Sequence, residues 1–499
     1  MKMKNNLRRL LVLVAVFVLT ITVMSVPKKA NATVTFAQKY HFACAVCHTV
    51  FPNLNPFGRA FWRNGFRLPG TNGTPADSTQ IAEGLSLPNP WPIPLMVEPV
   101  IVYQHYTNEN VNPQTDAFSI ADVALVASGN FKLYTPIANS LSFYVHMGLG
   151  EPGNGNSAFS IGLAQAWGSL NGLGSGFGIA PHLFNLKIGQ VTTASPYFYR
   201  QGPPLDVPGN IVGAGQGLTV GYDAENGVMI HSRNAGFDLY GTPGYHLWYK
   251  VTVTNDAGPQ YNNLGSATTD GVGTASGGGD SVSNAMEYSY QLKEYAPIPM
   301  GQLEFGYFGA TVAEPITVAG KGSWTNRVTV NGIDADIAND VYELGATYMV
   351  QNDAQPYGDP SLKSTPITLD GNTVGNTNSS NGYSEFEIYG RYLFSQIGNG
   401  VMLSADYAQY SWTHKDLQEG YSGNGTVATG GNGCADNSGL YQAGTYTENG
   451  AVCANEGVKD ELGIDLNYLL AYNARIYVSY LLTNKSQDNT VGAGLDFAF

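Results

Sequence analysis

The sequence predicts an all-β transmembrane barrel of about 16 antiparallel strands, preceded by a small, mainly α-helical N-terminal domain. Three observations predict this fold. Only 12% of the residues are charged, against roughly 25% in ordinary soluble proteins. Apolar and polar residues alternate with a period of two through much of the chain after residue 95, which is typical of barrels with lipid outside and a polar lumen inside. Beyond residue 32, no apolar run is long enough for a membrane helix.

Residues 1–32 have the pattern of an export signal. Four basic residues precede residue 10, residues 10–26 are apolar apart from Thr and Ser, and Ala30-Asn31-Ala32 is a small-residue cleavage site. The apolar run could instead anchor the chain in a membrane, but the cleavage site favours removal. We therefore expect the mature chain to begin near Thr33, in a compartment outside the cytoplasm.

The run Cys44-Ala45-Val46-Cys47-His48 is a C-x-x-C-H motif, the attachment signature of a c-type haem. The two thiols can form thioether links to the haem vinyl groups. The adjacent His48 can then ligate the iron from the proximal side. The motif predicts one covalent haem c, held by Cys44 and Cys47 with His48 as an axial ligand, in an exported redox protein.

Residues 33–95 form the small domain. So short a segment cannot build a large core, and it therefore needs a covalent cross-link or a bound group to be stable. Aromatic residues surround the motif and can form the haem pocket: Phe36, Tyr40, Phe42, Phe51, Phe57, Phe61, Trp62 and Phe66. Asn55-Pro56 precedes a predicted helix over residues 57–66. On that helix Arg59, Arg63 and Arg67 share one face. That face either contacts solvent, or it pairs with haem propionates or with lumen carboxylates such as Glu385, Glu387 and Asp465.

The second axial ligand of the iron stays open. Met96 is a candidate because methionine often supplies this ligand in cytochromes c and because Met96 follows a stiff, proline-rich segment. His41 and His105 are less favoured candidates, since His41 is tethered close to the motif and His105 lies on a predicted strand. An open site or a water ligand is the remaining possibility.

Residues 96–499 form the predicted barrel. Its last strand alternates strictly from Val491 to the terminal Phe499, and a terminal Phe resembles the signal read by barrel-assembly machinery in Gram-negative bacteria. A soluble β-sandwich or propeller would also alternate, but it would not need aromatic residues at strand ends. The predicted strands are residues 97–106, 118–128, 141–149, 159–169, 182–190, 215–223, 227–233, 245–254, 286–295, 302–312, 341–350, 385–394, 401–407, 461–470, 475–482 and 491–499.

Connection lengths predict the orientation of the barrel. The four residues 471–474 are a tight connection, as periplasmic turns are, whereas 255–282 and 413–458 are long and rich in Gly, Asn, Ser and Thr, as extracellular loops are. The second of these loops holds Cys434 and Cys453, the only other cysteines, and we expect a disulfide between them in an exported chain. Since the chain has 24 Lys and Arg against 38 Asp and Glu, nucleic acid is not an expected partner.

The order of these segments resembles a known family. An export signal, one C-x-x-C-H motif within residues 42–48, the run FPNLNPFG at 51–58 and a barrel ending on Phe499 follow one another. This order is similar to that of the fused monohaem cytochrome c–porins, the outer-membrane iron oxidases of iron-oxidising bacteria. The resemblance covers the full length, is most specific over residues 36–70, and is weak within the barrel.

The resemblance implies a cytochrome plug inside a 16-stranded barrel in the outer membrane. It also implies an oxidoreductase that takes electrons from extracellular Fe(II) and passes them to a periplasmic carrier. A blue copper protein or a soluble cytochrome c would serve as that carrier. Two other functions stay open. The protein could export electrons to minerals or partners, or it could be a porin whose plug is stapled by haem.

Overall fold

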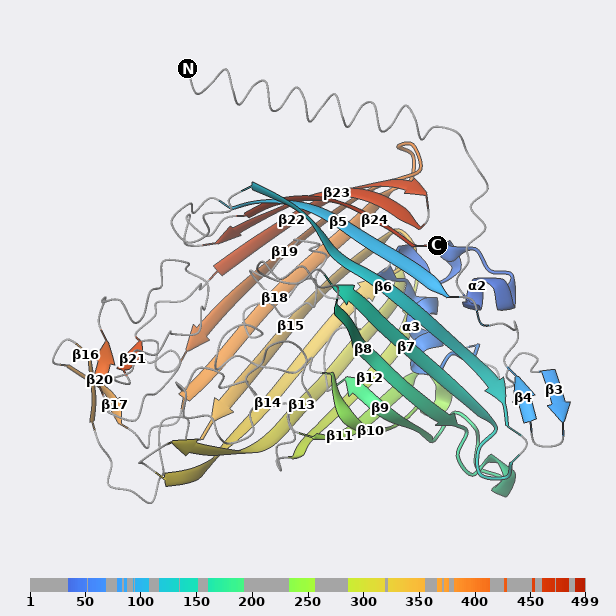
Figure 1. Ribbon diagram of the computed structural model, residues 1–499, viewed down its shortest axis with the longest axis horizontal. Coiled ribbons are helices and arrows are strands. Elements are labelled where there is room, and N and C mark those ends of the chain that lie inside the picture. The colour runs from blue at the N-terminus through green and yellow to red at the C-terminus, as the bar shows by residue number, and fades with distance from the viewer. Residues whose placement is uncertain are drawn as a thin grey trace.

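Sixteen antiparallel strands close into a barrel in the computed structural model (Figure 1). The structure describes residues 35–51, 53–68, 79–82, 85–87, 93, 95–106, 116–133, 135–150, 160–192, 233–255, 286–318, 322–354, 366–369, 372–376, 381–412, 426–428, 451–453, 460–471, 473–483 and 490–498. The export signal, the terminal Phe499 and Cys434 of the expected disulfide lie outside these residues. Within them, no helix is long and apolar enough to cross a membrane.

Each barrel strand pairs with its neighbours in sequence. The last strand, β24, pairs with the first, β5, and this pairing closes the ring. The strands are β5 (Met96–Tyr106), β6 (Asp116–Lys132), β7 (Ser140–Gly150), β8 (Ser160–Asn171), β9 (Asn185–Thr192), β10 (Arg233–Gly241), β11 (Leu247–Asn255), β12 (Met286–Ile298), β13 (Gly301–Val318), β14 (Gly322–Ala338), β15 (Tyr342–Asp353), β18 (Asn381–Phe394), β19 (Val401–Trp412), β22 (Asp460–Ala471), β23 (Ala474–Thr483) and β24 (Thr490–Phe497).

The predicted number of strands is confirmed, but two of the predicted strands differ from those observed. The predicted strands 215–223 and 227–233 lie outside the described residues, apart from Arg233. Strands β10 and β14 were not predicted. In β14, Val328 and Val330 are buried on the same face as Asp334 and Asp336, whereas Ile333 lies on the exterior. Because apolar side chains change face along this strand, no single alternating pattern runs through it.

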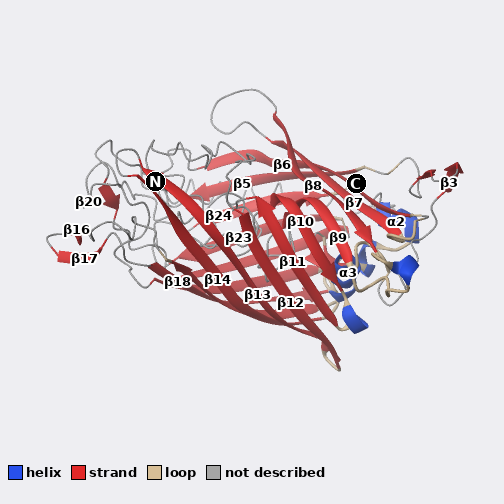
Figure 2. Ribbon diagram, turned by 90° about the horizontal axis from the view of Figure 1, so that it is seen from below, coloured by secondary structure: helices blue, strands red, loops and turns tan. Residues whose placement is uncertain are grey.

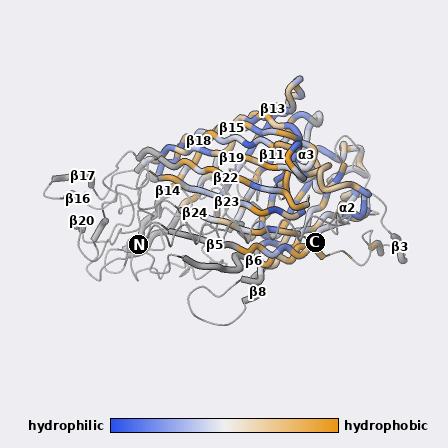
Figure 3. Tube along the Cα trace, turned by 90° about the horizontal axis from the view of Figure 1, so that it is seen from above, coloured by the Kyte–Doolittle hydropathy of each residue, from blue (hydrophilic) through white to orange (hydrophobic). Residues whose placement is uncertain are grey.

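The barrel is apolar outside and polar inside. Phe386 and Ile388 are each 42% exposed on the exterior, whereas Glu385 and Glu387, which alternate with them, are 1% and 0% exposed. The same alternation along β22 exposes Leu466 and buries its neighbours, and hydrophobic and hydrophilic residues alternate along the traces in Figure 3. A closed barrel with an apolar exterior leaves no strand edge unpaired in lipid. The protein therefore belongs in the bacterial outer membrane.

The two ends of the barrel differ. At one end the strands are joined by short turns, such as the two residues between β12 and β13 and the two between β22 and β23. This is the periplasmic end, because barrels of this class have short periplasmic turns. Strands β16 (Pro366–Leu369), β17 (Asn372–Asn376), β20 (Thr426–Ala428) and β21 (Ala451–Cys453) form a small sheet at the opposite end (Figures 1 and 2).

The N-terminal segment, residues 35–68, lies at the periplasmic end (Figure 2). It comprises α2 (Thr35–Tyr40), a 3-10 turn η1 (Cys44–Val46), a two-stranded sheet of β1 (His48–Val50) and β2 (Asn53–Leu54), and α3 (Pro56–Arg63). A second pair of short strands, β3 (Thr79–Ala82) and β4 (Leu85–Leu87), follows it. Helix α3 is shorter than the predicted 57–66, because Gly65 and Phe66 have left-handed φ angles of 64° and 59°.

The N-terminal segment shares its core with the barrel wall. Phe61 and Phe66 pack in one buried cluster with Met96 of β5, Tyr144 of β7 and Trp167 of β8. Hydrogen bonds add to this contact. The Lys39 ammonium donates to the carbonyl oxygen of Asn130 on β6 at 2.8 Å, and the Asn130 amide donates to the carbonyl of Phe66. The lumen wall therefore supplies apolar surface that so short a segment lacks.

Candidate functional site

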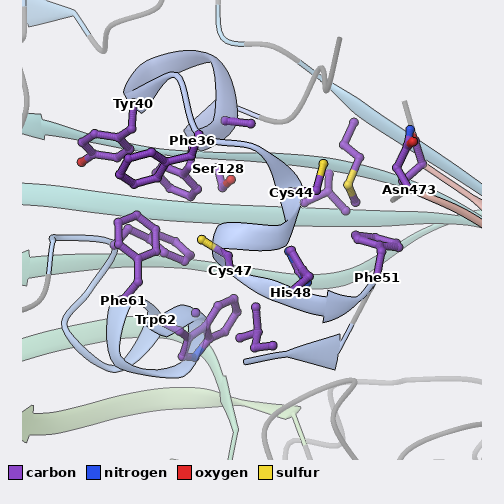
Figure 4. A pocket seen from close by; sticks show the side chains of 18 of the residues that line it. Phe36, Tyr40, Cys44, Cys47, His48, Phe51, Phe61, Trp62, Ser128 and Asn473 are labelled. Carbon is purple, nitrogen blue, oxygen red and sulfur yellow. The ribbon is translucent and has the colours of Figure 1, made fainter. Parts of the chain in front are cut away.

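An apolar cavity lies between the N-terminal segment and the barrel wall. Cys44, Cys47 and His48 all line it, together with aromatic and aliphatic side chains (Figure 4). In that view Phe36, Tyr40, Phe61 and Trp62 lie on one side of the three motif residues, and Phe51 and Asn473 on the other. The remaining lining residues are Ala37, Phe42, Ala43, Leu54, Gly58, Phe66, Met96, Val126, Ser128, Tyr144 and Ala498.

Local backbone structure brings the three motif residues to one cavity. The 3-10 turn η1 is closed by the amide of Cys47, which donates to the carbonyl of Cys44 at 3.1 Å, and strand β1 then begins at His48. The two cysteines are free thiols and are not joined to each other. Two thiols and an imidazole at the wall of one large apolar cavity fit the attachment and axial ligation of a haem c.

Asn55 holds the turn η1 against the start of α3. Its side-chain oxygen accepts from the Gly58 amide at 2.9 Å as the N-cap of α3. Its side-chain nitrogen donates to the carbonyls of Ala45 and Val46 at 3.2 and 3.1 Å, and its own amide donates to the carbonyl of Cys47 at 2.9 Å. One residue therefore joins the start of α3 to the motif.

Gly58 lets α3 approach the motif closely. A Cβ atom at this position would lie 2.1 Å from the carbonyl oxygen of Cys47, which is far inside van der Waals contact. From the sequence, Asn55 is predicted only to break the chain before Pro56, and Gly58 has no predicted role. An Asn before a Pro at the first helical turn is a recognisable cap, but nothing in the sequence indicates what that cap would contact.

The two thiols do not have the electrostatics of a redox-active dithiol. Burial raises the pKa of the Cys44 thiol. Burial, together with the nearby Cys44, raises the pKa of Cys47 to about 11. Catalytic dithiols instead depend on a lowered pKa that yields a thiolate at neutral pH. The raised pKa values therefore argue against thiol–disulfide exchange as the role of this pair.

The arginines of α3 pair with lumen carboxylates, as one of the sequence-based alternatives predicted. Arg59 contacts Glu343 at 2.5 Å and Asp336 at 2.8 Å, and Arg63 contacts Glu304 at 2.7 Å. The partners named from the sequence, Glu385, Glu387 and Asp465, were wrong. They lie on β18 and β22, whereas α3 faces β13, β14 and β15.

This ion cluster is fully buried, and its charges depend on each other. Burial disfavours the charged form of Arg59, but the carboxylates of Glu343, Asp336 and Glu304 outweigh it and hold the pKa of Arg59 well above its usual value. Arg67 differs from the other two, because it bonds neutral groups, including the side-chain oxygen of Asn185 at 2.8 Å. Arg59 and Arg63 therefore anchor α3 to the barrel wall.

Met96, one of the three candidates for the second axial ligand, lines the cavity. It is 8% exposed and is the first residue of β5. His41 is exposed at the protein surface and is not part of the lining. The side chain of His105 lies outside what the structure describes. Among the described residues, no group of three or more His, Cys, Asp and Glu side chains is placed to hold a metal ion.

Comparisons with known proteins match the fold alone. No protein-family model and no curated protein matches the sequence. Among solved structures, the chain is similar to an anion-selective porin from Comamonas acidovorans (10% identity, TM-score 0.47, 82% of this chain and 99% of that chain). It is also similar to OmpF of Salmonella typhi (11%, 0.45, 85% and 100%) and to OmpT of Vibrio cholerae (11%, 0.41, 82% and 99%).

Proposed function

We propose that Cys44 and Cys47 carry one covalent haem c, with His48 as its proximal ligand, and that the protein moves electrons between the cell exterior and the periplasm. The observation that carries this proposal is the cavity, because it gathers all three residues of the C-x-x-C-H motif against aromatic side chains. A haem c bound there would supply a one-electron redox centre.

The surrounding residues each have a task in this proposal. Asn55 and Gly58 fix the attachment turn against α3. The aromatic lining excludes water and keeps the cavity at a low dielectric constant, which is one way that proteins set a haem potential. Met96 reaches the same cavity from the barrel, so a thioether ligand would come from β5 and tie the plug to the wall.

The position of the cavity in the barrel supports a periplasmic electron acceptor and a donor that comes from the lumen. Because it lies at the periplasmic end, a soluble electron carrier can approach it from the periplasm, and a blue copper protein or a cytochrome c fits this role. The electron donor must then reach the cavity through the lumen. Together with the family resemblance, this supports extracellular Fe(II) as the donor and an iron oxidase as the activity.

Stopped-flow spectroscopy tests the activity. Oxidised, purified protein is mixed anaerobically with Fe(II) at acidic pH, and the α band of reduced haem is followed. We expect rapid and complete reduction. Reduction by dithionite but not by Fe(II) would overturn the iron-oxidase proposal and favour a low-potential haem that exports electrons.

Replacement of Met96 tests the axial ligand. Met96→Leu keeps the apolar volume but removes the sulfur, so we expect a changed ligand-sensitive spectrum and a lower haem potential. The buried apolar residue Val126, which also lines the cavity, offers a control as Val126→Ala, which should leave the axial spectrum unchanged. An unaltered spectrum in Met96→Leu would exclude Met96 as a ligand.

A second function is favoured by the barrel itself. Sixteen strands and a polar lumen are typical of porins that conduct small solutes, so the chain could be a porin with a haem-stapled plug. Conductance of the purified protein in planar bilayers distinguishes the two. Steady solute conductance combined with a haem that does not react with Fe(II) would favour the porin.

A further inference from the structure

A line of buried carboxylates descends the lumen wall toward the N-terminal segment. Glu387, Asp406 and Asp465 lie on the adjacent strands β18, β19 and β22 (Figure 1). Asp406 is opposite Tyr389 rather than Glu387, and Asp465 is opposite Ser404 rather than Asp406. Each carboxylate is therefore a diagonal neighbour of the previous one, two residues closer to the periplasmic end, at the roughly 7–8 Å that separates diagonal neighbours on paired strands.

The lowest carboxylate of the line lies between two hydroxyl groups. Asp465 is opposite Ser404 of β19 and Ser479 of β23. Both serines are at most 1% exposed, and within the described structure neither Oγ atom has a hydrogen-bond partner. A buried hydroxyl without a partner is rare, and it points to an ion or a water molecule at that position.

These side chains present only oxygen atoms. Asp406 and Asp465 supply two carboxylates, and Ser404 and Ser479 supply hydroxyls on either side of Asp465. Hard divalent cations prefer oxygen ligands, and Mg²⁺ in particular is often held by one or two carboxylates with water completing the shell. The composition therefore fits a partly hydrated divalent cation, and it gives no soft ligand for copper or zinc.

The same strands continue down to the haem-attachment turn. Met402 of β19 and Leu469 of β22 pack against Val50, the last residue of the strand that begins at His48. The oxygen-rich group therefore lies above the attachment turn on one wall of the lumen. A cation that enters from the outer end would meet it before it meets the cavity.

We propose that Asp406, Asp465, Ser404 and Ser479 form a lumen site for a divalent cation. The identity of that cation rests on the proposed function, under which it is Fe(II) held on its way to the haem. The site would collect this donor by its charge. As it nears the cavity, Fe(II) would give up one electron, which a ferric haem held by Cys44, Cys47 and His48 would accept.

Binding of Mn(II) to the haem-loaded, full-length protein tests the site, with free Mn(II) followed by electron paramagnetic resonance. Mn(II) prefers oxygen ligands and is not oxidised by the haem under these conditions. The double variant Asp406→Asn/Asp465→Asn should bind Mn(II) at least about tenfold more weakly, since loss of mere supporting partners already costs metal sites that much. Glu287→Gln, a buried lumen acid on β12, is the matched control and should bind as the parent does.

Equal Mn(II) binding in the parent and the double variant would overturn the site, as would no binding by the parent. If the double variant does not form a heat-modifiable barrel, Ser404→Ala and Ser479→Ala keep the charge and decide the matter. Each should weaken Mn(II) binding several-fold by removing one ligand, and unchanged binding in both would overturn the site.

The same variants separate the site from the proposed function. If the site delivers Fe(II), the Fe(II) concentration that gives half-maximal haem reduction rises at least about tenfold in the double variant, while reduction by dithionite is unchanged. Mn(II) binding without any haem reduction by Fe(II) would leave a cation site and reject the iron oxidase. Haem reduction by Fe(II) that is the same in parent and double variant would leave the oxidase and reject delivery by this site.

Discussion

Two groups of lumen carboxylates in this barrel have different neighbours and therefore different tasks. Glu304, Asp336 and Glu343 face arginines that α3 inserts into the wall. Asp465 instead lies opposite Ser404 and Ser479, with Asp406 as its diagonal neighbour on β19. The first group fastens the N-terminal segment in place, and the second is suited to a mobile cation. The role of a lumen carboxylate therefore depends on the residues that face it, and not only on the strand that carries it.

Removal of Arg59 should have the largest effect on the stability of the protein. Arg59→Ala leaves the buried Asp336 without its arginine partner, while Glu304 keeps Arg63 and Glu343 keeps Arg391, so we expect a loss of about 3–5 kcal/mol in the free energy of unfolding. Urea unfolding of the protein in lipid vesicles measures it. Arg327→Ala removes an exposed arginine of β14 and should cost no more than about 0.5 kcal/mol. Equal effects from the two changes would mean that the ion cluster does not anchor the segment.

The effect of Mn(II) on stability tests the second group of carboxylates, Asp406 and Asp465. A cation that binds only the folded barrel should stabilise it by about 2.7 kcal/mol at a concentration 100 times its dissociation constant. Asp465→Asn should remove most of this stabilisation, whereas Glu287→Gln should retain it. In metal-free buffer Asp465→Asn should change stability by less than about 1 kcal/mol, because it removes one of two neighbouring like charges. A metal-free loss as large as that of Arg59→Ala would make Asp465 a structural residue.

Gly58 separates helix propensity from contact with the motif. Gly58→Ala should stabilise an isolated helix by about 1 kcal/mol, but the new Cβ meets the carbonyl of Cys47 and should cost about 1–3 kcal/mol through overpacking. We expect net destabilisation and a broadened haem spectrum. Ala60→Gly, in the same helix, should lower stability by about 1 kcal/mol with a normal spectrum. Stabilisation by Gly58→Ala would show that α3 does not press on the turn.

Sequence reasoning reached the barrel because lipid imposes a period of two on each strand. It missed β14, where Val328 and Val330 lie on the lumen face with Asp334. It grouped Cys44, Cys47 and His48 because their predicted chemistry depends on local spacing, and all three line the cavity. It misplaced the partners of Arg59 because which wall α3 faces depends on the packing of Phe61 and Phe66 against β5, β7 and β8, and that packing is not a local property.

The roles of Asn55, Gly58, Ser404 and Ser479 could not be predicted for the same reason. The sequence indicates the helix cap at Asn55, but not what this residue or the other three would contact. The role of Asn55 follows from the carbonyls that it meets nine and ten residues back, and that of Ser404 from the register of β19 with β22. A pairing register across strands that are distant in sequence is fixed only when the barrel closes.

The most direct measurement is haem staining of the purified, full-length protein on a denaturing gel, with the haem content of the same sample. The account predicts one covalent haem per chain. Staining should be retained in Cys453→Ser, a cysteine change far from the cavity, and reduced or lost in Cys44→Ala and Cys47→Ala. A parent protein without covalent haem, or full staining in both Cys44→Ala and Cys47→Ala, would contradict the account.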